Sequence, residues 1–202
     1  DIHSGINTTG TLACEVLRTA RFDITTYRDA FSAALGIDPI TEPLPRLQSK
    51  TADIDASLAK DIAKDRDAML DVLFTHHVQP NLGREVPVIV RNYPLTQAAL
   101  ARQAADDELC AARFEMFFKG IELANGYDEL LDADELLQRT LINNQRRIAC
   151  GETPLPIDNS LVEAMRRGLP ASTGVALGFD RLLMLHTKSH SIDKVVPLTI
   201  EI

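Results

Sequence analysis

The chain has 202 residues, of which 45% are hydrophobic and 25% charged, and its formal net charge is −8. This composition is typical of a globular domain that is large enough to bury a core. The acidic balance argues against broad binding to nucleic acid or to anionic membranes, which usually requires a basic surface. Three widely spaced cysteines without a CxxC pair predict neither a zinc site nor a disulfide framework. With no apolar run of membrane-spanning length, we expect a cytoplasmic location without membrane contact.

The first part of the chain predicts helices that are separated by short breaks. The predicted helices are the end of one over 10–20, a second over 27–35 and a third over 65–78. Thr26 is placed to cap the second helix and Gly36 to end it. Residues 37–46 contain three prolines and predict a loop. We therefore expect residues 1–86 to be mainly helical.

The second part of the chain predicts a sheet. The predicted elements are a strand over 87–93, a hairpin over 112–130 that turns at Lys119-Gly120, helices over 132–150 and 158–168, and a strand over 174–178 followed by a helix. Asp158 is a suitable cap for the shorter helix and Gly168 a suitable end. Strands joined by hairpins with helices between them predict an α+β domain on an antiparallel sheet. We place the sheet-forming part at 87–202 and treat 1–202 as one domain.

Arg181 lies at the start of an apolar helix, just behind a glycine, in GVALGFDRLLML (174–185). Asp180 suits the first turn, because the free amides there carry partial positive charge. Arg181 in the same turn needs an anion nearby, which is either a carboxylate of the chain or a bound group such as phosphate. Arg181 is therefore a candidate anion-binding residue.

A second candidate site is GIELANGYDEL (120–130), which places Glu122 and Glu129 seven residues apart. In an uninterrupted strand this odd separation points the two side chains to opposite faces. A bulge at Asn125-Gly126 would return them to one face, where two carboxylates could hold Mg²⁺ and bind an ammonium group. The alternative is that Glu122 faces solvent and that Glu129 begins the next helix.

Together these segments resemble a known family. GVALGFDRLLML is similar to motif 3 of the class II aminoacyl-tRNA synthetases, and FFKGIELANGYDEL is similar to the preceding active-site strands of their lysyl branch. The longer stretch from 113 to 185, with PNLGREVPVIVRNYPLTQAALA before it, resembles the shortened lysyl-tRNA synthetase paralogues of the EpmA/PoxA/GenX family. These enzymes attach β-lysine to elongation factor P. The resemblance is strong over 65–190 and faint over 1–64.

The resemblance implies roles for individual residues. Arg181 is expected to bind the γ-phosphate of ATP, and Gly178 to let the backbone lie close to the adenosine. Glu122 and the adjoining Leu123 backbone are expected on the ATP and Mg²⁺ side. Glu129 and Asn125 are expected to contact the amino-acid substrate, and Ala176 to form the floor of its pocket. Arg181 and Glu122 are expected to be the catalytic residues. Glu122 and Glu129 are expected to be the metal ligands.

The implied reaction is ATP-dependent adenylation of a lysine-type amino acid and transfer of the acyl group to a lysine of elongation factor P. Alternatives are a C-terminal piece of a true lysyl-tRNA synthetase and a synthetase-like module without catalysis. A lysyl-tRNA synthetase usually has Gly-Leu-Gly-Ile-Gly at 174–178, so Ala176 favours the paralogues, for which tRNA is not an expected partner.

The resemblance also implies that the sheet is incomplete at its N-terminal side. Motif 1, which builds a homodimer interface, and motif 2, which supplies an arginine to the α-phosphate, are expected before Asp1. The chain would then be the C-terminal portion of the catalytic domain, and inactive when alone. We also expect an open sheet edge along PVIV (87–90) and GVAL (174–177).

Overall fold

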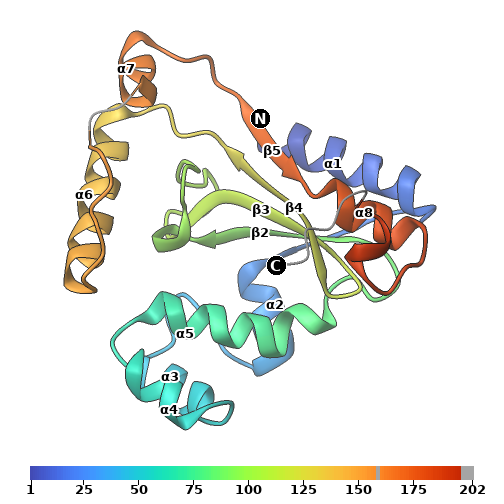
Figure 1. Ribbon diagram of the computed structural model, residues 1–202, viewed down its shortest axis with the longest axis horizontal. Helices are drawn as coiled ribbons and strands as arrows, with labels where there is room; N and C mark the ends of the chain where they lie inside the picture. The colour runs from blue at the N-terminus through green and yellow to red at the C-terminus, as the bar shows by residue number, and fades with distance from the viewer. Residues whose placement is uncertain (158–159, 197–202) are drawn as a thin grey trace.

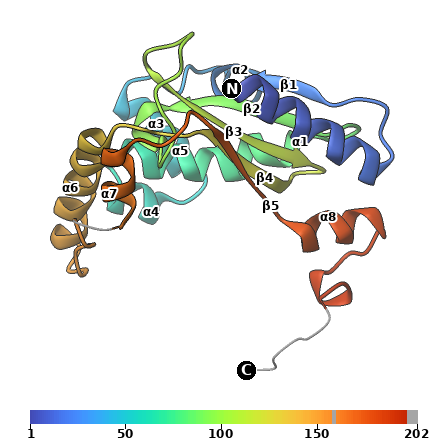
Figure 2. The same ribbon diagram turned by 90° about the horizontal axis from the view of Figure 1, so that it is seen from above.

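A five-stranded sheet forms the centre of the molecule in the computed structural model, which describes residues 1–157 and 160–196. The strands are β1 (Asp23–Thr26), β2 (Val88–Pro94), β3 (Cys110–Phe118), β4 (Ile121–Asp128) and β5 (Thr173–Leu177). The α-helices are α1 (Ile2–Leu17), α2 (Tyr27–Leu35), α3 (Leu44–Ala52), α4 (Ala56–Asp61), α5 (Arg66–Leu73), α6 (Ala133–Ala149), α7 (Ser160–Arg167) and α8 (Phe179–His186). The predicted α+β class is confirmed, with helices flanking the sheet (Figures 1 and 2).

The strands follow one another across the sheet in the order β1-β2-β3-β4-β5. The pairs β2–β3, β3–β4 and β4–β5 are antiparallel, as predicted. β1 was not predicted, and it pairs with β2 in parallel. Its sequence, DITT, is short and largely exposed, so it lacks the apolar alternation that identifies a strand. β2 therefore has a hydrogen-bonded strand on each side, β1 and β3, and the predicted open sheet edge along PVIV is wrong.

Helices cover the two faces of the sheet and bury separate apolar clusters. One face packs against α2, α3, α5 and the turns after α5, around Tyr27, Phe31, Leu70 and Phe117. The opposite face packs against α1 and α8, around Ile6, Phe114, Leu123 and Leu182. In Figure 1 the first group of helices lies below the sheet and the second at its upper right. The sequence alternation in β3 divides its residues between these clusters.

A β-bulge in β4 lies at Leu123. Met116 pairs with Ala124 while Phe117 pairs with Glu122, so Leu123 is the extra residue. Leu123 and Ala124 both contribute to the cluster under α1 and α8. The alternation is thereby shifted, and Glu122 falls on the same face as Asn125. The bulge predicted at Asn125-Gly126 is therefore wrong in its position, because the register through these two residues is regular and the bulge lies at Leu123.

Two predictions for the helical part need correction. Residues 37–46 are not entirely a loop, because α3 begins at Leu44 with Pro45 in its first turn. Proline is accepted there, since the first amides of a helix have no partner within it. The helix predicted over 65–78 ends as an α-helix at Leu73 and continues as a π-turn over Phe74–Val78. A π-turn widens the helix locally and often occurs at functional sites.

The predicted helix over 132–150 is present as α6, which packs with α7 through Leu136, Val162 and Met165. Gly168 follows α7 with a φ of 95°, which explains why a glycine ends this helix. Asp158, the predicted cap, lies outside the described residues. In the part of the chain that the structure describes, no helix has both the length and the apolar character needed to cross a bilayer.

Candidate functional site

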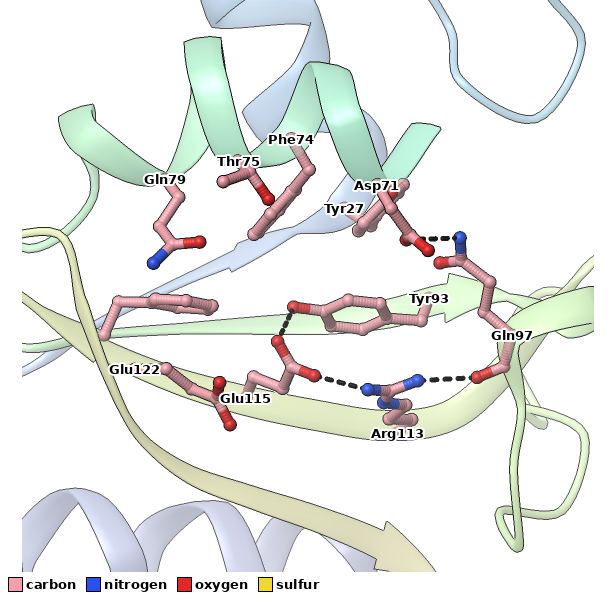
Figure 3. Close-up of a pocket in the computed structure, with 11 residues that line it drawn as sticks. Tyr27, Asp71, Phe74, Thr75, Gln79, Tyr93, Gln97, Arg113, Glu115 and Glu122 are labelled. Atoms are coloured by element: carbon pink, nitrogen blue, oxygen red, sulfur yellow. Dashed lines mark hydrogen bonds and ion pairs between the residues drawn. The ribbon is translucent and has the colours of Figure 1, made fainter. Parts of the chain in front are cut away.

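A polar cavity lies between the sheet and the end of α5. Its volume is about 290 Å³. The helical side contributes Tyr27, Asp71, Phe74, Thr75 and Gln79, and the sheet side contributes Tyr93, Arg113, Glu115, Phe117 and Glu122, with Gln97 at one end. Figure 3 shows the two groups facing each other across the cavity. The π-turn after α5 thus supplies one wall of the cavity.

Glu115 is fixed in this cavity by two neighbours. Tyr93 donates a hydrogen bond from its hydroxyl to Glu115 Oε2 at 2.6 Å, and Arg113 Nη2 pairs with Oε1 (Figure 3). Arg113 also donates to the Gln97 carbonyl oxygen at 2.7 Å, and its guanidinium lies over the Tyr93 ring. Gln97 in turn donates to Asp71 Oδ1 at 3.0 Å. A continuous hydrogen-bonded network therefore crosses the cavity from β3 to α5.

Glu122 connects the cavity to the start of α8. Its side chain lines the cavity, and Arg181 Nη1 lies 3.7 Å from its carboxylate. The same nitrogen donates to the Glu122 carbonyl oxygen at 2.9 Å. The anion that Arg181 needs is thus a neighbouring carboxylate in the free protein. Both side chains remain about half exposed, so a bound phosphate could still reach the guanidinium.

Two carboxyl groups of the cavity, those of Glu122 and Asp71, have raised pKa values. Burial and the charge of Glu115 raise the pKa of Glu122 above its usual value. Burial and the charge of Asp67 raise the pKa of Asp71 to about 6. Both shifts disfavour the ionised form, and a cation bound between the carboxylates would reverse the effect.

Magnesium fits the pair Glu115 and Glu122. Mg²⁺ prefers oxygen ligands and usually takes one or two carboxylates together with substrate phosphates and water. Within residues 1–157 and 160–196, no group of three or more His, Cys, Asp and Glu residues is placed to hold a metal. The metal site that fits these residues is one in which two carboxylates and the phosphates of a nucleotide bind the ion together.

The structure places Glu129 in a different cavity from Glu122. Glu129 lines a second cavity, which is bounded by Leu130, Leu161 and Met165 on the side of α7. Burial and the charge of Asp128 raise the pKa of Glu129, while a hydrogen bond from the Gly174 backbone lowers it. Glu129 does not begin the next helix, since α6 starts at Ala133. Glu115, not Glu129, is the carboxylate that shares a cavity with Glu122; the metal-binding role of Glu129 stays a prediction.

The other predicted residues lie along β4 and β5. Ala176 pairs with Asn125 across the two strands, so both face the side of the sheet that carries Glu115. Asn125 donates to the Tyr127 hydroxyl at 2.9 Å, and its buried Oδ1 has no hydrogen-bond partner in the described residues. This oxygen therefore keeps unused capacity to accept a hydrogen bond.

Gly178 and Leu123 join β4 to the start of α8. The Gly178 amide donates to the Leu123 carbonyl oxygen at 2.8 Å. A Cβ added at Gly178 would have its nearest neighbours at 3.6 Å, which is ordinary contact. The chain itself therefore does not require glycine at this position, and a requirement would have to come from a ligand.

Of the residues that line this cavity, the sequence identified only Glu122 as a site residue. It missed the hydrogen-bonded network of Asp71, Tyr93, Gln97, Arg113 and Glu115. The hairpin turn at Lys119-Gly120 was recognised, and pairing strands outward from it would have placed Glu115 near Glu122. Phe117 pairs with Glu122, and Glu115 lies two residues before Phe117, so Glu115 and Glu122 share a face without the bulge. The contribution of α5 depends on tertiary packing.

The comparison with protein families identifies the class of protein. A family model described as class II tRNA synthetases (D, K and N) matches residues 6–201. The chain therefore belongs to the class II tRNA synthetase family, in the group that covers aspartate, lysine and asparagine. Membership supports an ATP-dependent ligase that activates an amino acid, and the class generally uses ATP and Mg²⁺.

Proposed function

We propose that this chain belongs to an enzyme that activates β-lysine with ATP and transfers it to a lysine side chain of elongation factor P. The observation that supports adenylation best is the arrangement of Glu115, Glu122 and Arg181 at the junction of β3, β4 and α8. Two carboxylates suit a magnesium ion and a half-exposed arginine suits a phosphate. ATP brings both groups together.

The reaction consists of two transfers. The carboxylate oxygen of the amino acid attacks the α-phosphorus of ATP, and the bond to pyrophosphate breaks. The amine of the acceptor lysine then attacks the acyl carbon of the adenylate, and AMP leaves. Arg181 holds a phosphate in place, so that catalysis is mainly positioning and charge stabilisation. Magnesium, when bound by Glu115 and Glu122, would offset part of the phosphate charge.

The amino-acid substrate is assigned to the surface of β4 and β5. The free Oδ1 of Asn125 and the Glu129 carboxylate are suited to bind ammonium groups. Ala176 lies opposite Asn125, where its methyl group narrows the space available to the substrate. We propose that this methyl group favours β-lysine over lysine, whose amino group is one carbon nearer to the carboxylate.

A lysyl-tRNA synthetase is the second candidate, because the matched family includes that class of enzyme. A non-catalytic synthetase-like module is less well supported, since Glu115, Glu122 and Arg181 are all in place. For the complete protein we propose a cytoplasmic homodimer.

Pyrophosphate exchange and acyl transfer by the full-length protein test the proposal. Exchange should depend on β-lysine more strongly than on lysine, and purified elongation factor P should accept labelled β-lysine. Efficient charging of tRNA with lysine, without labelling of elongation factor P, would instead establish the second candidate. Failure to exchange with either amino acid would favour the non-catalytic module.

A further inference from the structure

We infer that Tyr93 and Arg113 are positioning residues that hold Glu115 for a divalent cation. This inference rests on the proposed function, in which Glu115 and Glu122 bind the metal. It assigns a role to two residues that the proposed function does not use for binding the nucleotide or the substrate. Their effect is exerted through the orientation of one carboxylate.

Tyr93 restrains one oxygen of Glu115. Its hydroxyl donates to Glu115 Oε2 at 2.6 Å, and the side chains of both residues are buried. The Tyr93 ring is itself fixed by the aromatic cluster around α2, with its centroid 4.7 Å from that of Tyr27 and 6.2 Å from that of Phe74. A buried ring that cannot shift gives the hydroxyl a fixed position.

Arg113 restrains the other oxygen of Glu115. Nη2 pairs with Oε1, while Nη1 is committed to the Gln97 carbonyl oxygen at 2.7 Å. The guanidinium carbon lies 4.7 Å from the Tyr93 ring centroid, so the two positioning residues also fix each other. Both terminal nitrogens of Arg113 are engaged inside the protein, and its Nε is buried without a hydrogen-bond partner among the described residues. We therefore assign Arg113 to the support of Glu115 and not to the phosphates.

Each oxygen of Glu115 thus keeps capacity for one further ligand in a direction set by its neighbours. A carboxylate accepts about four hydrogen bonds or ligands in all, and Tyr93 and Arg113 use two. Residues that orient metal-binding carboxylates typically change metal affinity by about 10- to 100-fold when they are removed. We expect the same of Tyr93 and Arg113.

The cavity offers a matched pair of tyrosines for the test. Tyr27 and Tyr93 line the same cavity, are 1% and 4% exposed, and belong to one aromatic cluster. The Tyr93 hydroxyl binds Glu115, whereas the buried Tyr27 hydroxyl has no hydrogen-bond partner in the described part of the chain. Tyr93→Phe and Tyr27→Phe therefore remove the same atom from similar surroundings, and only the first removes a contact with Glu115.

The experiment measures Mn²⁺ binding to the full-length protein by electron paramagnetic resonance in the presence of a non-hydrolysable ATP analogue, with Mg²⁺ as competitor. Tyr93→Phe should raise the Mn²⁺ dissociation constant about 10-fold or more, and Tyr27→Phe should leave it unchanged. Arg113→Lys keeps the buried charge but loses the forked geometry, and should also weaken binding about 10-fold. Melting temperatures show that each variant is folded at the temperature of the titration.

Glu115→Gln separates the inference from the proposed function. If Glu115→Gln abolishes Mn²⁺ binding while Tyr93→Phe behaves like Tyr27→Phe, the positioning role is overturned and the metal site stands. If Glu115→Gln binds Mn²⁺ as the unmodified protein does, or if that protein binds none, the metal site itself is wrong and the inference falls with it.

Discussion

Arg181 holds Glu122 through two contacts, a hydrogen bond of 2.9 Å to its carbonyl oxygen and an approach of 3.7 Å to its carboxylate. The side chains are 49% and 40% exposed, so the ion pair stabilises the fold by no more than about 1 kcal/mol. Each of the two charged groups can therefore leave this ion pair and bind another partner at little cost in free energy. A metal at Glu122 and a phosphate at Arg181 would separate the two charges and satisfy each of them.

Arg181→Ala should reduce pyrophosphate exchange by the complete protein about 10²-fold or more, as expected for loss of a preorganised charge contact. The melting temperature should change little, because the pair is exposed. Arg167→Ala is the control, since Arg167 is also exposed and lies 3.3 Å from the Glu163 carboxylate. Equal exchange rates for the two variants would remove Arg181 from the nucleotide site.

Gly174→Ala should displace the Glu129 carboxylate. A Cβ at Gly174 would lie 2.2 Å from Glu129 Oε1, far inside van der Waals contact. The complete enzyme should therefore show a higher KM for its amino acid. Gly178→Ala is the matched control, because its Cβ would meet nothing closer than 3.6 Å. That variant should instead weaken ATP binding if the backbone there approaches the adenosine. An unchanged amino-acid KM in Gly174→Ala would mean that Glu129 does not contact the substrate.

The fold could be predicted from the sequence wherever local signals were strong. The hairpin from β3 to β4 and the capped helix α2 follow from turn chemistry, alternation and a Thr26 cap that the structure contains. β1 was missed because a short exposed strand at a sheet edge has little apolar pattern. The start of α3 was missed because prolines at a helix N-terminus resemble those of a loop.

The site could be predicted only in part, for a different reason. Arg181 stood out because a cation in the first turn of a helix is unfavourable without a partner. Glu115 carries no such local conflict. Its importance comes from Tyr93 on the neighbouring strand β2 and from Arg113, which lies two residues earlier on β3. The meeting of α5 with the sheet depends on long-range packing, which a sequence pattern does not encode.

Ala176→Gly should raise the use of lysine relative to β-lysine. The methyl group of Ala176 lies on the face of the sheet that carries Asn125, where we place the amino-acid substrate. One methyl group in a pocket typically decides about 1–3 kcal/mol between substrates. The measurement is the ratio of pyrophosphate-exchange efficiencies for the two amino acids. A ratio equal to that of the unmodified enzyme would show that Ala176 only packs.

The pKa of Asp71 predicts how stability depends on pH. Burial and the Asp67 charge raise that pKa from 3.8 to about 6, so between these values the folded chain binds the extra proton. Stability should therefore be highest below this window and fall as the pH rises through it. In a fully buried group, this pKa shift would lower the free energy of unfolding above the window by on the order of 3 kcal/mol. Because the Asp71 side chain is exposed to solvent, we expect its titration to lower the free energy of unfolding by at most about 1 kcal/mol.

Asp71→Asn should flatten the pH dependence of stability between about pH 4 and pH 6, since an amide does not titrate. Urea unfolding at several pH values measures the free energy of unfolding of both chains. A difference between them that stays constant with pH would show that Asp71 titrates normally in the folded protein.

β5 is one of the two edge strands of the sheet, where the isolated chain can associate with another chain. Among the described residues it pairs only with β4, and Val175 on this strand is 40% exposed. An open, partly apolar edge of this kind is a template for pairing with another chain. We therefore expect residues 1–202 alone to form dimers or larger species that grow with protein concentration, as measured by sedimentation velocity.

The same isolated chain should not form an aminoacyl adenylate at an appreciable rate. Arg113 and Arg181 are the arginines that pair with Glu115 and Glu122 in the described residues. Arg113 is committed to Glu115 and to the Gln97 carbonyl, so it cannot neutralise the α-phosphate during attack. Loss of one such charge contact typically costs about 10²–10³ in rate. Pyrophosphate exchange with β-lysine or lysine on residues 1–202 decides the matter, and turnover close to that of the full-length protein would contradict the prediction.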